Sequence, residues 1–219
     1  MNPILQRILT LLIAVMIPFF LLMTAIRLLF SPVFMQLEYR TPGFPADTYG
    51  FTLEDRLHWS RISLEYLLNN SEIEYLANQQ LADGSPLYNE RELSHMVDVK
   101  VLVQKMLIAW WILFVILLGL GLWAWRAGWQ PTYLRGLGSG GRLTIGLIIL
   151  ILAAVAISFR ALFTGFHQIF FSGDTWLFLY SDTLIRLFPI RFWQDGFIAM
   201  GIFTLLGAGA LILLEKKLG

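Results

Sequence analysis

Four long apolar runs decide most of what this chain can fold into. Each supplies roughly 20 residues, the length that a helix needs to cross a hydrocarbon core of about 30 Å. Buried helices of a water-soluble protein would show a polar face, and these runs show almost none. We therefore predict an all-α integral membrane protein, a single membrane domain over residues 1–219, with four transmembrane helices at about 8–28, 104–125, 143–163 and 196–214.

The composition agrees with a membrane protein and excludes several kinds of site. Hydrophobic residues make up 57% of the chain and charged residues 14%, whereas soluble domains carry about 25% charged residues. A net charge of +1 gives no reason to expect a nucleic-acid partner. The chain has no cysteine, which excludes disulfides, thiolate metal sites and a cysteine nucleophile.

The first apolar run is longer than the core of a signal peptide, which spans roughly 7–15 residues. The sequence SPVFMQ that follows lacks a cleavage pattern of small residues. We therefore expect the first run to be a retained membrane anchor.

The distribution of basic residues predicts the orientation in the membrane. Basic residues dominate the N-terminal end, the connection between the second and third runs, and the C-terminal end, and they are Arg7, Arg126, Arg135, Arg142, Lys216 and Lys217. The positive-inside rule therefore places both termini in the cytoplasm and residues 31–103 and 164–195 outside. For the Gly-rich segment GLGSGG, residues 136–141, we expect a flexible cytoplasmic linker, because a phosphate-binding loop would need a preceding strand.

Residues 31–103 carry three helix-start signals and are predicted to form a small helical extracytoplasmic cap. Thr52 with Asp55, Ser71 with Glu74, and Asn89 with Glu92 each resemble a capping box. The last of these predicts a helix that begins near Asn89 and continues into the second transmembrane span.

Residues 164–195 form the second outer segment and are unusually rich in aromatic residues. Aromatic rings prefer the headgroup level of a membrane, so we predict an interfacial segment. We expect Phe166, Phe170, Phe171 and Trp176 to lie at the acyl-chain boundary of the membrane and to help form a lipid-binding pocket. The alternative is an interfacial anchor that binds no ligand.

Two of the three histidines approach one membrane level from different segments. His95 precedes the second span, and His167 follows the third. Asp98 shares a helix face with His95 and is a candidate to orient its ring, or is only a solvated charge. Arg160 lies within an apolar run, where a charge is costly and often functional, but it could also extend outward to the headgroups. His58 is expected to be structural.

The sequences YGFTLEDR, NERELSHMVDVK, GFHQIFFSGDTWLF and SDTLIRLFP occur in an order that resembles the bacterial lipoprotein intramolecular transacylases, and the resemblance covers nearly the whole chain. It implies a multi-pass acyltransferase of the bacterial cytoplasmic membrane. Its substrate would be a lipoprotein whose N-terminal cysteine carries a diacylglyceryl group. The enzyme would move the sn-2 acyl chain to the cysteine α-amine and leave a lyso-form lipoprotein. The resemblance maps the outer-face histidines of the family onto His95 and His167.

The chemistry of that reaction suits two histidines and requires no cofactor. An α-amine has a pKa of roughly 7.7–8.0 and an imidazole roughly 6.5, so an imidazole can take the amine proton near neutral pH. We expect His95 to be this base and His167 to stabilise the oxyanion, although either residue suits either role.

Two other functions use the same residues. His58, His95 and His167 with Asp98 could bind zinc in a lipid hydrolase. A non-catalytic lipid-binding membrane scaffold is the second alternative.

Overall fold

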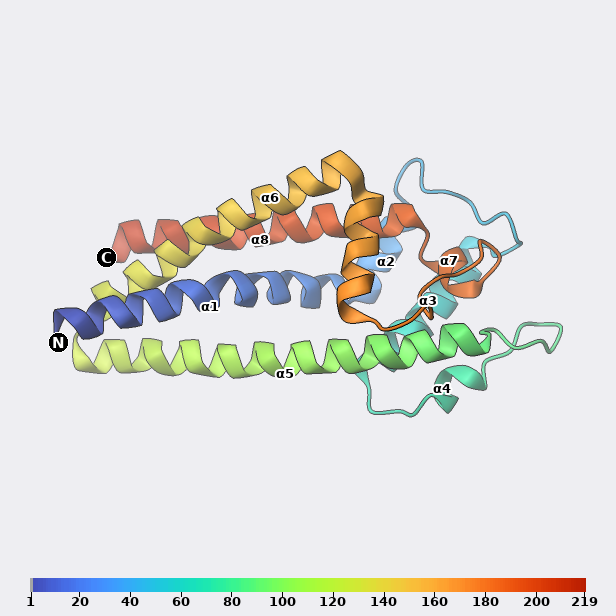
Figure 1. Cartoon of the computed structure of the whole chain (residues 1–219), viewed down its shortest axis with the longest axis horizontal. Helices are drawn as coiled ribbons and strands as arrows, with labels where there is room; N and C mark the ends of the chain where they lie inside the picture. Colours follow the sequence, from blue (N-terminus) through green and yellow to red (C-terminus); the bar gives the residue numbers. More distant parts are fainter. Residues whose placement is uncertain (1) are drawn as a thin grey trace. The chain divides into compact units, whose positions relative to one another are not determined.

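The computed structural model describes residues 2–219, and its named elements in that range are all helices, with no strand (Figure 1). In chain order the helices are α1 Pro3–Leu29, α2 Pro32–Glu38, α3 Leu53–Leu68, α4 Glu74–Ala77, α5 Glu90–Ala127, α6 Gln130–Phe170, α7 Thr183–Leu187 and α8 Ile190–Leu218. The chain divides into two compact units. The first comprises Met1–Leu29, Met106–Ile157 and Phe197–Gly219, and the second comprises Phe30–Lys105 and Ser158–Gly196.

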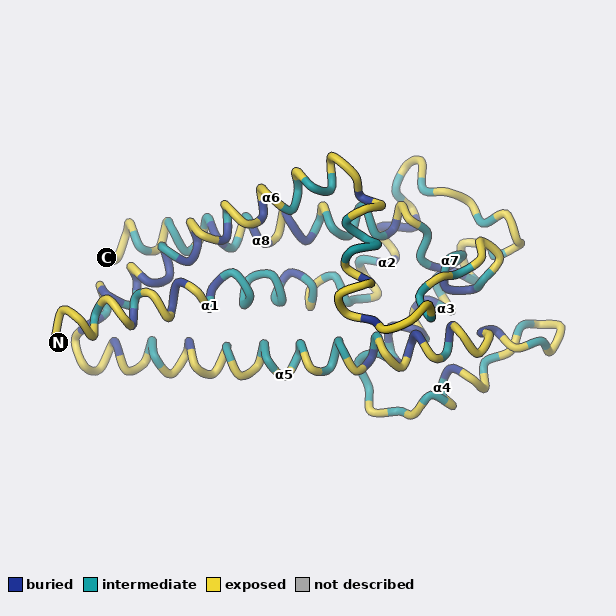
Figure 2. Tube along the Cα trace, in the orientation of Figure 1, coloured by how far each residue is buried: buried dark blue, intermediate teal, exposed yellow. Residues whose placement is uncertain are grey.

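Helices α1, α5, α6 and α8 are long and apolar enough to cross a membrane, which confirms the four spans expected from the sequence. Their large apolar side chains are mostly outward-facing, as the exposed surface along α5 shows (Figure 2). Trp125 of α5 and Leu150 of α6 are 77% and 67% exposed, for example. A helix with this surface is stable where the surrounding medium is lipid, because its backbone groups are satisfied internally and its side chains match the solvent.

In the first unit, the Gly-rich segment 136–141 is a buried part of α6, so the expected flexible linker is wrong. Gly136 and Gly140 lie against α1. A Cβ added at Gly136 would stand 2.8 Å from Cβ of Ile13, and one added at Gly140 would stand 2.5 Å from Cβ of Ile17. Glycines spaced four apart allow two helix backbones to approach closely in a membrane, where packing replaces the hydrophobic effect as the driving force.

We expect Gly140→Ala to destabilise the protein by about 1–3 kcal/mol, the usual cost of forcing an extra group into a packed interface. Gly146→Ala on the same helix is the matched control, since a Cβ there meets no atom within 4 Å. Thermal unfolding of both variants in the same detergent would measure the difference. Equal melting temperatures for the two would contradict the close α1–α6 contact.

In the second unit, two of the three expected capping boxes are present. Thr52 and Asp55 cap α3 reciprocally. At the start of α5, Asn89 N–H donates to Glu92 Oε2 over 2.9 Å, and Glu92 N–H donates to Asn89 Oδ1 over 3.0 Å. The capping box expected at Ser71 is absent. The backbone N–H of Ser71 donates to Asn69 and its carbonyl accepts from Lys100, so this residue closes the end of α3 and does not begin α4.

Helix α5 begins at Glu90 and continues without a break to Ala127. This confirms the expected helix that begins near Asn89 and runs into the second span. Its first turns therefore belong to the second unit and carry His95 on a rigid element.

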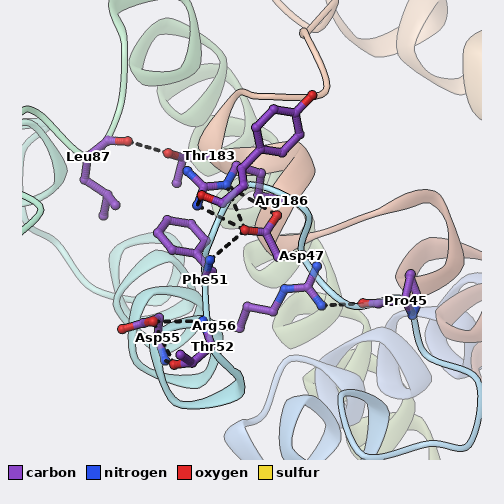
Figure 3. A network of polar contacts seen from close by, with 10 residues as sticks. Pro45, Asp47, Phe51, Thr52, Asp55, Arg56, Leu87, Thr183 and Arg186 are labelled. Atoms are coloured by element: carbon purple, nitrogen blue, oxygen red, sulfur yellow. Dashed lines mark hydrogen bonds and ion pairs between the residues drawn. The ribbon is translucent and has the colours of Figure 1, made fainter.

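A buried ion pair ties the loop before α3 to α7 (Figure 3). Arg186 Nη2 lies 3.1 Å from Asp47 Oδ2, and the two side chains are only 11% and 3% exposed. The guanidinium also lies 3.5 Å from the ring centre of Phe51, whose N–H donates to the same carboxylate. Burial acts to raise the pKa of Asp47, but the hydrogen bonds from Arg186 and Phe51 outweigh it and hold that pKa below its ordinary value.

We expect Asp47→Asn to lower stability at pH 7 by roughly 3 kcal/mol, because it leaves a buried guanidinium without its counter-charge. The folded pKa of Asp47 is depressed, so its contribution is present above the unfolded pKa of about 3.9 and is lost as the pH falls through the folded value. The difference in melting temperature between wild type and Asp47→Asn should therefore shrink below about pH 4. Glu54→Gln, at an exposed carboxylate nearby, is the control and should show no such gap.

Candidate active site

His95 and His167, far apart in the sequence, lie face to face in the second unit. His95 is on the first turns of α5 and His167 is on the last turns of α6. Their ring centres are 5.9 Å apart and the ring planes differ by 23°. Both residues are buried, at 7% and 8% exposure. The structure thus brings together the two histidines that the sequence singled out.

The position of His167 depends on a break in α6 that the sequence did not indicate. The helix expected over 143–163 is interrupted at Ser158, whose backbone is extended (φ −161°, ψ 92°). Ser158 Oγ accepts a hydrogen bond from Ala161 N–H over 3.3 Å, so this serine caps a separate helical segment that carries His167.

Aromatic rings surround both imidazoles. His95 contacts Phe171 and Phe178, with ring centres 5.0 and 5.3 Å away. The ring centres around His167 lie between 4.3 and 5.5 Å away and belong to Phe163, Trp176, Phe166 and Phe171. Three of the four aromatic residues expected at a substrate site therefore contact a histidine.

Phe170, the fourth of these residues, contacts Phe166 and is 42% exposed. Sequence reasoning missed Phe163 and Phe178. Phe163 stands one helical turn before His167, a spacing that places the two rings on one face and could have identified it. Phe178 lies in an irregular segment, where no periodicity predicts which way a side chain points.

The hydrogen bonds of the two imidazoles differ. Nδ1 of His167 lies 2.8 Å from the carbonyl oxygen of Phe163. A carbonyl only accepts, so the proton is on Nδ1, and Nε2 of the neutral ring keeps its lone pair. Nδ1 of His95 is buried and has no partner among the described residues. Asp98 was a candidate either to orient that ring or to be only a solvated charge; it is exposed, and His95 Nδ1 donates no hydrogen bond to it in this structure.

Arg160 lies on the same segment of α6 as His167, at a spacing that places it toward the same helix face, and is exposed. His58 stands elsewhere in the second unit, exposed on α3 with its ring 4.4 Å from that of Trp59. It borders a surface hollow of about 500 Å³ shared with Asp55 and Arg61. Within residues 2–219, no three His, Cys, Asp or Glu side chains stand close enough to hold a metal ion, so the residues of the zinc alternative do not converge.

Comparison with known proteins identifies the family. A model of the lipoprotein intramolecular transacylase Lit matches residues 11–193. An uncharacterized protein of Aquifex aeolicus is 29% identical over 219 residues, which is 98% of this chain and 95% of that protein. The membrane-integral lipoprotein intramolecular transacylase Lit of Bacillus cereus, solved in meso, has the same fold, with a TM-score of 0.82, 22% identity, and coverage of 98% of this chain and 96% of that one.

A variant of the Bacillus cereus protein with a histidine replaced by alanine matches with a TM-score of 0.76, again at 22% identity, over 98% of this chain and 93% of that one. The structural likeness shows the fold, and the family model covers most of the chain and shows the class of enzyme. The chain belongs to the lipoprotein intramolecular transacylase family and is a membrane-integral acyltransferase.

Proposed function

We propose that the paired imidazoles of His95 and His167 catalyse transfer of the sn-2 acyl chain of a diacylglyceryl-cysteine to the α-amine of the same cysteine. The observation that carries this proposal is the approach of two buried histidines to within 5.9 Å. Aminolysis of an ester needs a general base for the amine proton and a hydrogen-bond donor for the oxyanion. One imidazole can act as the base and the other as the donor.

We assign the proton acceptor to His167, which reverses the roles expected from the sequence. Its Nδ1 donates to Phe163 O, which leaves the Nε2 lone pair available. The substrate amine attacks the ester carbonyl carbon and forms the new C–N bond. His167 Nε2 takes the proton that the nitrogen loses. A fixed tautomer matters because a ring that rotates or exchanges its proton presents the lone pair only part of the time.

We assign oxyanion stabilisation to His95. Its Nδ1 is buried without a partner, and an unpaired lone pair there costs less than an unpaired N–H, so the proton belongs on Nε2. The Nε2–H donates to the carbonyl oxygen as negative charge develops on it. When the tetrahedral intermediate collapses, the bond from carbon to the glyceryl oxygen breaks. His167 returns its proton to that oxygen, and the products are an amide and a free hydroxyl.

The nucleophile in this scheme belongs to the substrate, so the chain needs no serine or cysteine nucleophile. We propose that Phe166, Phe170, Phe171 and Trp176 hold the acyl chain beside the histidines, supported by the ring contacts of three of them. Asp98 is then a solvated charge on α5. Arg160 extends toward lipid headgroups, whose phosphates a guanidinium binds well.

The proposed setting is the outer face of a bacterial cytoplasmic membrane. The basic residues near both ends of the chain support cytoplasmic termini. Residues 31–103 then form an extracytoplasmic cap and residues 164–195 an interfacial segment. The lipid tails of the substrate anchor in the membrane, while its amine and ester linkage reach headgroup level, where we place the two histidines.

Mass spectrometry of one lipoprotein's N-terminal peptide tests this function. The chain is expressed in a host that makes diacylglyceryl-lipoproteins and lacks its own N-acyltransferase. Transfer within one molecule leaves the total mass unchanged, so we expect an isobaric peptide whose fragments carry the acyl chain on the amine. A lipid hydrolase would lower the mass by one acyl chain. A non-catalytic scaffold would leave both mass and fragments unchanged, and either result would refute the proposal.

A further inference from the structure

The chain segment that follows His167 covers both histidines. Residues 172–180, which we name the aromatic cover, form the irregular chain between α6 and α7 (Figure 1). Trp176 of the cover has its ring centre 5.1 Å from that of His167, and the ring centre of Phe178 is 5.3 Å from that of His95. Because both imidazoles are less than a tenth exposed, the cover is part of what separates them from solvent.

The aromatic cover is firmly attached just beyond its two ends. Before it, Phe171 N–H donates to His167 O over 2.8 Å. After it, Leu184 N–H donates to Glu92 Oε1 over 2.7 Å, and Asn89 Nδ2 donates to Asp182 Oδ1 over 3.2 Å. These bonds fix the ends of the cover to the helices that carry the histidines.

Between these ends, Phe178 packs against the buried cluster that includes Tyr66 and Met96, and one side chain from another segment forms a hydrogen bond to the cover among the described residues. Arg91 Nη1 donates to Leu177 O over 3.0 Å. The remaining hydrogen bonds of residues 172–180 among the described residues are internal turns or bonds to Asp182. Leu177 lies between Trp176 and Phe178 in the sequence, so the hydrogen bond from Arg91 meets the cover between the two residues whose rings contact the histidines.

The space beneath the cover is poor in groups that would retain water. A buried water typically makes two to four hydrogen bonds. The side chains around the histidine rings are phenylalanine and tryptophan, and the buried polar atoms there without a partner among the described residues are His95 Nδ1 and Thr175 Oγ1, which are few for a bound water. A closed cover thus encloses the two imidazoles in mostly apolar surroundings.

This enclosure matters because the reaction has a competitor. If water replaces the substrate amine, its oxygen attacks the ester carbonyl carbon and one of its protons passes to His167. The bond to the glyceryl oxygen breaks, and that oxygen receives the proton. The products are a free fatty acid and a lyso-lipoprotein whose amine is unmodified. Water is far more concentrated than any lipid amine, so an acyltransferase must exclude it.

We propose that Arg91 is a positioning residue that keeps the aromatic cover closed over His95 and His167, and that it thereby sets the ratio of acyl transfer to hydrolysis. This inference rests on the proposed function. Among the described residues, Arg91 forms no hydrogen bond to either histidine. It acts through the Leu177 carbonyl and the two rings on either side of it.

The ratio of products tests the proposal, since a loss of folded enzyme lowers both products alike. We expect Arg91→Ala to raise the hydrolysed fraction of a diacylglyceryl-lipopeptide about tenfold, the effect of losing one charge-assisted hydrogen bond. Arg91→Lys keeps a cationic donor and should restore much of the ratio. Arg40→Ala is the matched control, because Arg40 is also exposed and donates Nη1 to a backbone carbonyl, that of Gln36, over 2.9 Å. An unchanged ratio in Arg91→Ala would overturn the proposal.

A second measurement does not depend on catalysis. The chain contains no cysteine, so His95→Cys introduces a single thiol beneath the cover. A membrane-impermeant, water-soluble maleimide should label it slowly, and about tenfold faster when Arg91→Ala is added, by the same loss of one hydrogen bond. Equal labelling rates with and without Arg91 would show that Arg91 does not hold the cover. Failure of the proposed transfer reaction would appear in the wild-type lipopeptide, whereas the labelling rates judge the cover alone.

Discussion

Replacing His167 by alanine is expected to lower the rate of N-acyl product formation by about 10²–10⁴, the usual effect of removing a general base. The amine would then have no acceptor for the proton it loses. Initial rates with a diacylglyceryl-lipopeptide, normalised to the amount of enzyme in the membrane, measure the effect. His58→Ala is the control, because His58 is exposed on α3 and its ring contact is with Trp59. A His167→Ala variant within a few-fold of wild type would exclude His167 as the base.

Replacing His95 by alanine is expected to lower the same rate by about 10²–10³, the effect of losing one oxyanion donor. His95→Gln distinguishes this role from that of a base. A glutamine side chain keeps an N–H donor but cannot accept a proton from an amine at neutral pH. We therefore expect His95→Gln to recover part of the activity that His95→Ala loses.

If His95→Gln is as slow as His95→Ala while His167→Gln recovers activity, the two roles are the reverse of our assignment. Asp98→Asn should change the rate little, because Asp98 is exposed and the structure shows no hydrogen bond between it and His95 Nδ1. A severe loss in Asp98→Asn would indicate that the carboxylate reaches the ring when substrate is bound.

A short sequence pattern predicted the structure correctly where nearby residues alone decide the backbone, and failed where a distant residue intervenes. The capping box of Asn89 and Glu92 could be identified from the sequence because it lies within four consecutive residues. It correctly predicted the start of α5. The same kind of pattern at Ser71 was misleading. There, the distant side chain of Lys100 binds the Ser71 carbonyl, and the backbone closes α3 instead of opening α4.

The glycines of residues 136–141 show that a Gly-rich segment can be either a flexible linker or a site of close helix packing. Glycine raises the flexibility of an isolated chain, which led to the expectation of a linker. Packed against Ile13 and Ile17 of α1, the same residues permit close contact between helices and form a buried part of α6. The partner helix lies more than a hundred residues away in the sequence, so no local pattern could have identified it.

The sequence by itself determined the four membrane-spanning helices, because lipid forces each span to satisfy its own backbone and to present apolar side chains along its whole length. It also indicated His95 and His167 as polar residues near the ends of two spans. Only the tertiary structure decided that their rings face one another, that Ser158 breaks α6, and that Phe163 fixes the tautomer of His167. It also decided that Arg91 donates a hydrogen bond to the Leu177 carbonyl of the aromatic cover. The approach of the two rings and the bond from Arg91 depend on contacts between segments that are far apart in the sequence, and such contacts leave no periodic pattern in it.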